Sequence, residues 1–187
     1  MNLNARFLDD AEQTDPSVPE HTVNPFAERG ILRARVLIEK DNEPVRVLRI
    51  FVGTDEQGFL LEQCFSKLLM NQETLAILYG QHVHLFDMAS HRVVSHFLGD
   101  YVCNIYPVPD PFSPLLSESF LAATFCYTFL ISIRQGVVWR SGQCAIDGVI
   151  IDEIAGNVIH GSGEWDPPGG WRPFKLSLDT GKVIKEA

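Results

Sequence analysis

The densest group of residues that can take part in recognition lies in the segment from Ser162 to Pro173. Its aromatic and charged members are Glu164, Trp165, Asp166, Trp171 and Arg172. Tryptophan and arginine side chains often anchor protein interfaces, and carboxylates beside them favour a basic partner. The segment therefore predicts a partner-binding loop. The alternative is that both tryptophans fold back as a cap over the last strands, with Arg172 paired to Glu164 or Asp166.

The same segment separates two expected strands, 157–160 and 174–176. It is longer than the roughly 2 to 5 residues of most hairpin loops, and its Pro167-Pro168 and Gly169-Gly170 pairs favour a stiff reversal of the chain. Two further carboxylates, Asp152 and Glu153, follow the apolar strand 149–151. An acid–base pair would need a cleft and perturbed pKa values. We assign both residues to the same partner-binding surface instead.

His82 and His84 are two residues apart on one expected strand, so their side chains share a face. Together with His91 or His96 they would offer nitrogen ligands to a metal. A metal needs three or four ligands in fixed geometry, and this spacing fixes only two. The other interpretation, which we favour, is that this face is the solvated side of the strand. We expect no metal and no cofactor.

The motifs that mark common enzyme sites are missing from the sequence. It has no Gly-x-Ser-x-Gly elbow and no glycine loop for phosphate, so we predict no catalytic residues. Four cysteines are present, none of them in a C-x-x-C pair: Cys64, Cys103, Cys126 and Cys144. Without the spacing of a zinc site, they are expected to be small apolar residues.

A repeated phrase indicates which elements position these residues. A strand, a tight polar turn and a second strand recur at 85–94, 132–139 and 177–184, and a weaker copy lies at 45–61. Each interval between the clear copies holds two further strands, at 101–108 and 120–126 and again at 145–152 and 157–161. Four strands in a period of about 45 residues are typical of a β-propeller blade. The sequence therefore predicts an all-β fold of antiparallel four-stranded units.

These units resemble quinoprotein-type β-propeller repeats over about residues 60 to 187. The best matches are the turn and strand at 179–184 and the strand Gly136-Val-Val-Trp139. The chain departs from that family in carrying only three clear units and only one such tryptophan. The resemblance implies a propeller-like fold, either a small four-blade ring or an open curved stack, and it implies no cofactor. The phrase at 163–174 also resembles a segment of bacterial proteins without an assigned activity.

Residues 1–30 differ in composition from the rest of the chain. They are rich in acidic residues and are interrupted by prolines at 16, 19 and 25. Such a segment is typical of an extended or partly disordered arm, which Phe7-Leu8 and Pro25-Phe26 would fix locally. We therefore expect an acidic arm at 1–30 followed by a single propeller-like domain at 31–187.

Charge and hydropathy limit the classes of partner. The formal net charge of −9 argues against nucleic acid, whose phosphates require clustered cations. The first residues lack the apolar core of a signal peptide, and the richest apolar stretch, 120–133, is shorter than a membrane span. These features predict a cytoplasmic protein that does not enter membranes.

Taken together, these features favour a protein-binding module over an enzyme. The most specific hypothesis is a bacterial immunity protein that occludes the active site of a cognate basic toxin, such as a nuclease. One alternative is an interaction or structural subunit that docks through its acidic arm. A further alternative is a hydrolase or lyase with a pocket near His82, His84 or the acidic turns.

Overall fold

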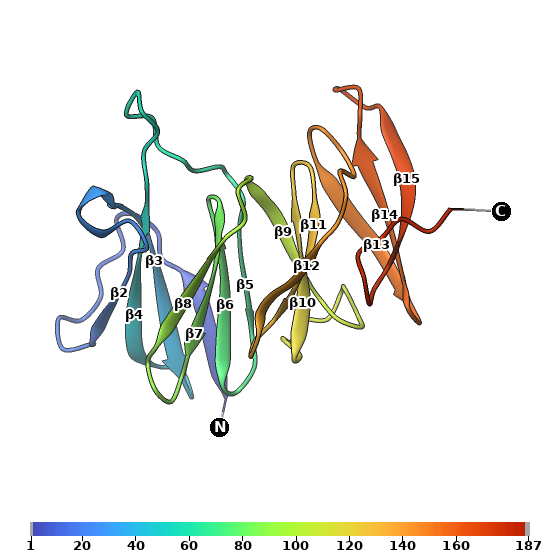
Figure 1. Ribbon diagram of the computed structural model, residues 1–187. Helices are drawn as coiled ribbons and strands as arrows, with labels where there is room; N and C mark the ends of the chain where they lie inside the picture. Colours follow the sequence, from blue (N-terminus) through green and yellow to red (C-terminus); the bar gives the residue numbers. More distant parts are fainter. Residues whose placement is uncertain (1, 186–187) are drawn as a thin grey trace.

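Four β-sheets stand side by side in the order of the chain (Figure 1). The computed structural model describes residues 2–185, and within this range the regular structure is β-strand apart from one 3-10 turn, η1 (Ala27–Arg29). This architecture confirms the predicted all-β class and its repeated units. No helix within the described range is long and apolar enough to cross a membrane.

The first sheet is built around a long hairpin. Its strands are β1 (Leu3–Phe7), β2 (Glu20–Val23), β3 (Ile31–Lys40) and β4 (Glu43–Val52), in the order β1-β3-β4-β2. β3 and β4 reverse at Asp41 and Asn42, which have positive φ angles of 52° and 68°. Aspartate and asparagine tolerate this left-handed conformation better than most residues, so the turn is local in origin.

The expected arm contributes directly to this sheet. β1 pairs antiparallel with β3, and β2 pairs parallel with β4, which places the fully buried Val23 in the core. Residues 8–19, here called the leader loop, lie against the outward face of the sheet, where Leu8 and Val18 pack on Leu37 and Val47. The composition of residues 1–30 had set this segment apart from the core. Its acidic residues and prolines dominate the composition, and β1 and β2, with only five and four residues, are too short to give a clear strand pattern.

The second and third sheets follow the predicted repeat. The second comprises β5 (Ser66–Met70), β6 (Thr74–Tyr79), β7 (His82–Asp87) and β8 (Val93–Phe97). The third comprises β9 (Val102–Pro107), β10 (Ser119–Thr124), β11 (Thr128–Ser132) and β12 (Gly136–Arg140). Every neighbouring pair in these two sheets is antiparallel, and the chain visits the strands in spatial order.

The fourth sheet has three strands: β13 (Val149–Ala155), β14 (Val158–Glu164) and β15 (Trp171–Ser177). After β15 the chain turns through Gly181, and Val183 forms a bridge to Leu176. Ile184 N also donates to Lys175 O at 2.9 Å. The segment 183–184 therefore takes the place of a fourth strand at the edge of this sheet.

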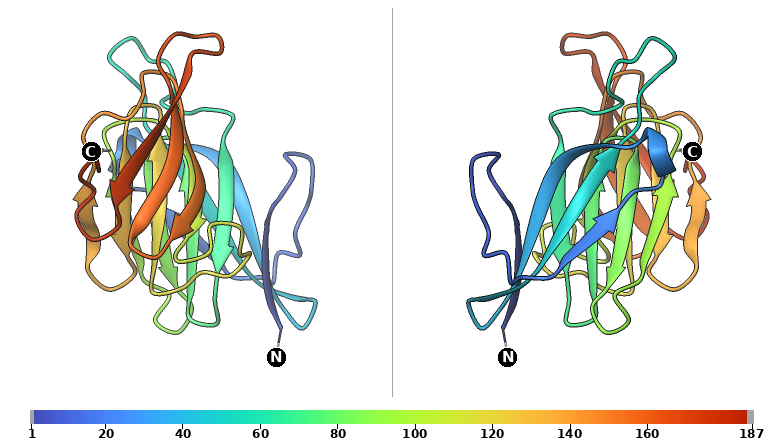
Figure 2. Two further views of the ribbon diagram at one scale, coloured as in Figure 1. Left: turned by 90° about the vertical axis from the view of Figure 1, so that its right-hand side faces the viewer. Right: turned by 90° about the vertical axis from the view of Figure 1, so that its left-hand side faces the viewer.

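Apolar side chains fill the three spaces between neighbouring sheets. The first strand of each sheet touches the first strand of the next, from β1 to β5, β9 and β13, as along the axis of a propeller. The first and last sheets nevertheless lie at opposite ends of the row (Figures 1 and 2). Of the two arrangements expected from the sequence, the protein has the open stack.

Trp139 illustrates how adjacent repeats are joined. Its indole Nε1 donates to Leu178 O at 2.8 Å, which links β12 to the turn that follows β15. Gly181 lies beneath the same ring, where a Cβ atom would be only 2.5 Å from Trp139. The repeated turn thus supplies both the reversal of the chain and a contact between sheets.

Candidate partner-binding face on the last sheet

The β14–β15 hairpin is longer than expected, and its loop is correspondingly shorter. The two strands pair as far as Glu164 and Trp171, so the loop spans only residues 165–170. Gly161 and Gly163 both lie within β14. They allow close packing, since a Cβ atom on Gly161 would be 2.6 Å from the Phe174 ring, and one on Gly163 would overlap Cys144 O.

Hydrogen bonds hold the tip of this hairpin in one shape. Gly169 N donates to Glu164 Oε1 at 2.6 Å. Trp165 N donates to Gly170 O, and Gly170 N donates to Asp166 O, both at 3.0 Å. The tip projects past the ends of the neighbouring strands (Figure 2, left). A loop fixed in this way loses little conformational entropy on binding.

Strand register places most of the predicted partner-binding residues on one side of the sheet. Ile151, Ile159 and Leu176 face inward and pack against the third sheet. The positions that alternate with them face away from the stack, and we call this side the open face. Its members are Ile150, Asp152, Glu153, His160, Ser162, Glu164, Trp171, Pro173 and Lys175.

Trp171 lies near one end of the open face. It is paired with Glu164, and its ring reaches across the sheet to Gly148, where a Cβ atom would be 3.5 Å from the indole. The Trp171 side chain remains 41% exposed, and Ile150 is 43% exposed. Two large apolar side chains therefore face solvent on one surface.

Two carboxylates of the open face, Asp152 and Glu153, lie toward its middle, whereas Glu164 lies beside Trp171 at one end. Glu153 is in register with His160, and His160 is in register with Lys175. Asp152 occupies a bulge in β13, where Ser162 Oγ donates to its Oδ2 at 3.2 Å. A hollow of about 340 Å³ opens between Asp152, Lys175 and the segment 183–184. The open face thus combines a hollow, exposed apolar groups and negative charge.

The remaining predicted residues do not lie on this face. Trp165 is half-buried in the tip of the hairpin, and Asp166 is exposed there. Arg172 is paired with Gly163 and points to the opposite side. None of the ion pairs formed among residues 2–185 involves Arg172, so the pairing with Glu164 or Asp166 that the alternative interpretation included does not form.

The histidines of β7 are buried, which corrects the expected solvated face. His82 and His84 are 8% and 1% exposed and stack in parallel with ring centroids 5.6 Å apart. Burial lowers the pKa of His82 to about 4 and that of His84 to about 3. The available signal that both faces of β7 are covered was the presence of apolar residues on both, with Phe86 on the face of the two histidines and Val83 and Leu85 on the other.

The other two histidines of this hairpin do not complete a metal site. His96 lies in register with Val83, so it is on the opposite face of the sheet. His91 lies in the turn after β7, beside Arg46. No group of three or more histidine, cysteine, aspartate or glutamate side chains in the described part of the chain could hold a metal ion.

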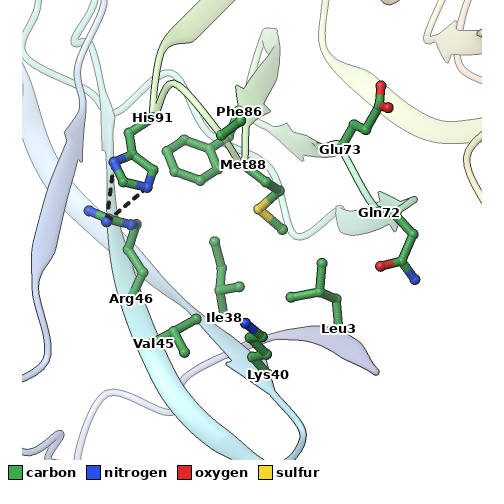
Figure 3. Close-up of a pocket in the computed structure, with 11 residues that line it drawn as sticks. Leu3, Ile38, Lys40, Val45, Arg46, Gln72, Glu73, Phe86, Met88 and His91 are labelled. Carbon is green, nitrogen blue, oxygen red and sulfur yellow. Dashed lines mark hydrogen bonds between the residues drawn. The ribbon is translucent and has the colours of Figure 1, made fainter. Parts of the chain in front are cut away.

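A cavity of about 450 Å³ between the first two sheets had no counterpart in the sequence analysis. Its walls come from β1, from the β3–β4 hairpin, from the turn before β6, and from the end of β7 with the turn that follows it (Figure 3). These segments lie up to about 90 positions apart in the chain, so no local pattern connects them.

No protein-family model and no curated protein sequence matches the chain.

Proposed function

We propose that this protein is a protein-binding module that docks a basic partner on the open face of its last sheet. The observation that carries the proposal is the presence of Trp171 and Ile150, both more than 40% exposed, next to Asp152, Glu153 and Glu164 on one surface. Contiguous exposed apolar groups mark interaction sites, and tryptophan is a frequent anchor of such interfaces.

Electrostatics specify the kind of partner. The carboxylates of the open face lie on a chain of net charge −9. A basic surface would be attracted at long range and oriented by this field, which raises association rates at low salt. The most specific form of the proposal is a bacterial immunity protein that covers the active site of a basic toxin, for which the quinoprotein-like blades would serve only as a rigid scaffold.

The test is affinity purification of the tagged protein from its native cells, followed by identification of what is retained. We expect one stoichiometric basic protein, lost when Trp171→Ala is combined with Glu153→Lys. The matched control is Phe112→Ala, because Phe112 is a 77% exposed aromatic residue in the β9–β10 connection. Retention by the Trp171 and Glu153 variant would overturn the proposed face.

The immunity hypothesis requires a second result. Co-expression with the identified partner should rescue cells that the partner poisons, and the double variant should fail to rescue them. A partner that is not toxic would contradict the immunity form while leaving the open face as the binding surface.

A second candidate function is an interaction subunit that docks through the leader loop. Half of the 24 acidic residues lie within the first 62 positions, and Asp9, Asp10 and Asp15 are exposed in this loop. Deleting the first 28 residues would remove β1 and β2, and with them the buried Val23. Exchange of the three aspartates for asparagine is the appropriate test, because it should weaken binding through the leader loop and leave binding through the open face intact.

A further inference from the structure

The cavity between the first two sheets combines an apolar floor with cationic groups at its rim. Its lining residues are Leu3, Ile38, Lys40, Val45, Arg46, Gln72, Glu73, Phe86, Met88, Ala89 and His91. It lies near the end of the stack that is remote from the last sheet (Figure 1). Its volume of about 450 Å³ is within the range of small-molecule sites.

The floor of the cavity is formed by side chains of the hydrophobic core. Ile38 and Phe86 are each 1% exposed and belong to the cluster between the first two sheets. Figure 3 shows Met88 beside Phe86, with Leu3 and Val45 on the flanks. An aliphatic or aromatic group placed here would leave water and contact carbon atoms on several sides.

Two cations at the rim, Lys40 and Arg46, are not bound to any carboxylate within the described range. Neither Lys40 nor Arg46 belongs to any ion pair among residues 2–185. The Nη2 atom of Arg46 lies 3.2 Å and 3.4 Å from the two ring nitrogens of His91, so the guanidinium contacts an uncharged partner or a second cation. Glu73 is the one carboxylate among the described residues that line the cavity, and it lies on the side away from Arg46 (Figure 3).

The turn that carries His91 is fixed in an unfavourable conformation. His91 has a positive φ of 58°, a left-handed backbone conformation that is unfavourable for a residue with a side chain. Asp87 holds the turn by accepting hydrogen bonds from Ser90 N at 2.6 Å and from Ser90 Oγ at 2.7 Å. The His91 ring lies parallel to Phe86, with centroids 6.1 Å apart. His91 and Arg46 are therefore positioned at the rim before any ligand arrives.

From this geometry we propose that the cavity binds a small organic anion with an apolar tail. The anionic group is held by Arg46 and Lys40, and the tail lies over Ile38, Phe86 and Met88. Arginine and lysine supply charge-assisted hydrogen bonds, and the apolar floor excludes ions that have no tail. This site is separate from the open face and does not depend on the function proposed there.

The experiment is a calorimetric titration of the full chain with octanoate, together with NMR of the Met88 methyl group. We expect saturable one-to-one binding with a Kd on the order of 1 mM or tighter. The Met88 signal should shift along the same saturation curve. The contributions of the charge and the tail of octanoate are measured separately by titrating two control compounds. Acetate lacks the tail, and 1-octanol lacks the charge. Both should bind at least about tenfold more weakly than octanoate.

Arg46→Gln should weaken octanoate binding about tenfold or more, because it removes a charge-assisted hydrogen bond. The matched control is Arg172→Gln, which should leave binding unchanged, because Arg172 is an exposed arginine on the last sheet that forms no ion pair within residues 2–185. The proposal is overturned if octanoate does not bind, if the Met88 signal stays fixed, or if Arg46→Gln and Arg172→Gln bind octanoate alike.

Discussion

The two buried histidines of β7 should make the protein markedly less stable in mild acid. Histidine has an ordinary pKa near 6.5, and burial lowers the pKa of His82 to about 4 and that of His84 to about 3. Below about pH 6.5 the unfolded chain takes up a proton at each position, while the folded protein does not until the pH approaches these lower values. Stability is therefore complete above the ordinary pKa and is lost as the pH falls.

The size of the effect follows from the gap in pKa. Each pH unit below the unfolded pKa costs about 1.4 kcal/mol per histidine while the folded form remains neutral. At about pH 5 each histidine therefore destabilises the fold by about 2 kcal/mol relative to neutral pH. The pair accounts for up to about 4 kcal/mol, a large share of the roughly 5 to 15 kcal/mol that stabilises a typical domain.

The assay is urea unfolding at several pH values between about 7.5 and 5, for the wild type and for His82→Phe. Phenylalanine suits this site because the aromatic rings of Phe26 and Phe97 lie 5.1 Å and 5.2 Å from His82. The variant should lose about half of the contribution that this pair makes to the decline in the free energy of unfolding, since it keeps His84. Adding His84→Asn should remove most of the rest of that contribution and leave the decline due to His21 and His96, whose pKa values burial also lowers.

Ile77→Val is the matched control. Ile77 is fully buried and in register with His84, so the change should cost about 1 kcal/mol at every pH and leave the slope unchanged. If the free energy of His82→Phe runs parallel to that of the wild type from neutral to acidic pH, the argument from burial is refuted.

Three further outcomes follow from the packing. Thermal melts should show that Gly181→Ala lowers Tm more than Gly156→Ala. Both glycines have positive φ angles, but only a Cβ atom at 181 would meet the Trp139 ring. Ellman's reagent should react with the exposed Cys64 well before Cys103, whose pKa burial raises to about 12; equal rates in the native protein would contradict this. Arg35→Ala should speed amide exchange within the leader loop, since Arg35 donates to Asp9 O at 3.1 Å and to Glu12 O at 2.6 Å, while Arg172→Ala should not.

The repeated sheets were predictable because their signals are local. Alternating apolar runs and turn residues at fixed offsets mark each hairpin, and Gly136 and Gly181 adopt the positive φ angles that such turns need. The apolar stretch 120–133 forms the buried hairpin of β10 and β11. A period of about 45 residues then fixed the number of strands in each unit.

The pairing of β1 and β2 was not predictable in this way. β2 joins β4 in parallel, and a parallel pair leaves no hairpin turn in the sequence. The candidate site was predictable in part. Trp171 and Glu164 do lie together on one face, but Arg172 follows Trp171 directly and therefore points to the other side. The cavity near Arg46 depends on three separate segments and needed the assembled structure.

The open stack also determines how copies of this chain can associate. The leader loop lies over the outward face of the first sheet, whereas the last sheet presents its outward face to solvent. Head-to-tail growth into a filament would join these two unlike ends, and the leader loop obstructs one of them. The loop thus acts as the terminal cap of a repeat array. Two uncapped ends that associate with each other would form an isologous contact, with the two last sheets meeting about a two-fold axis, and such a pair closes at two copies.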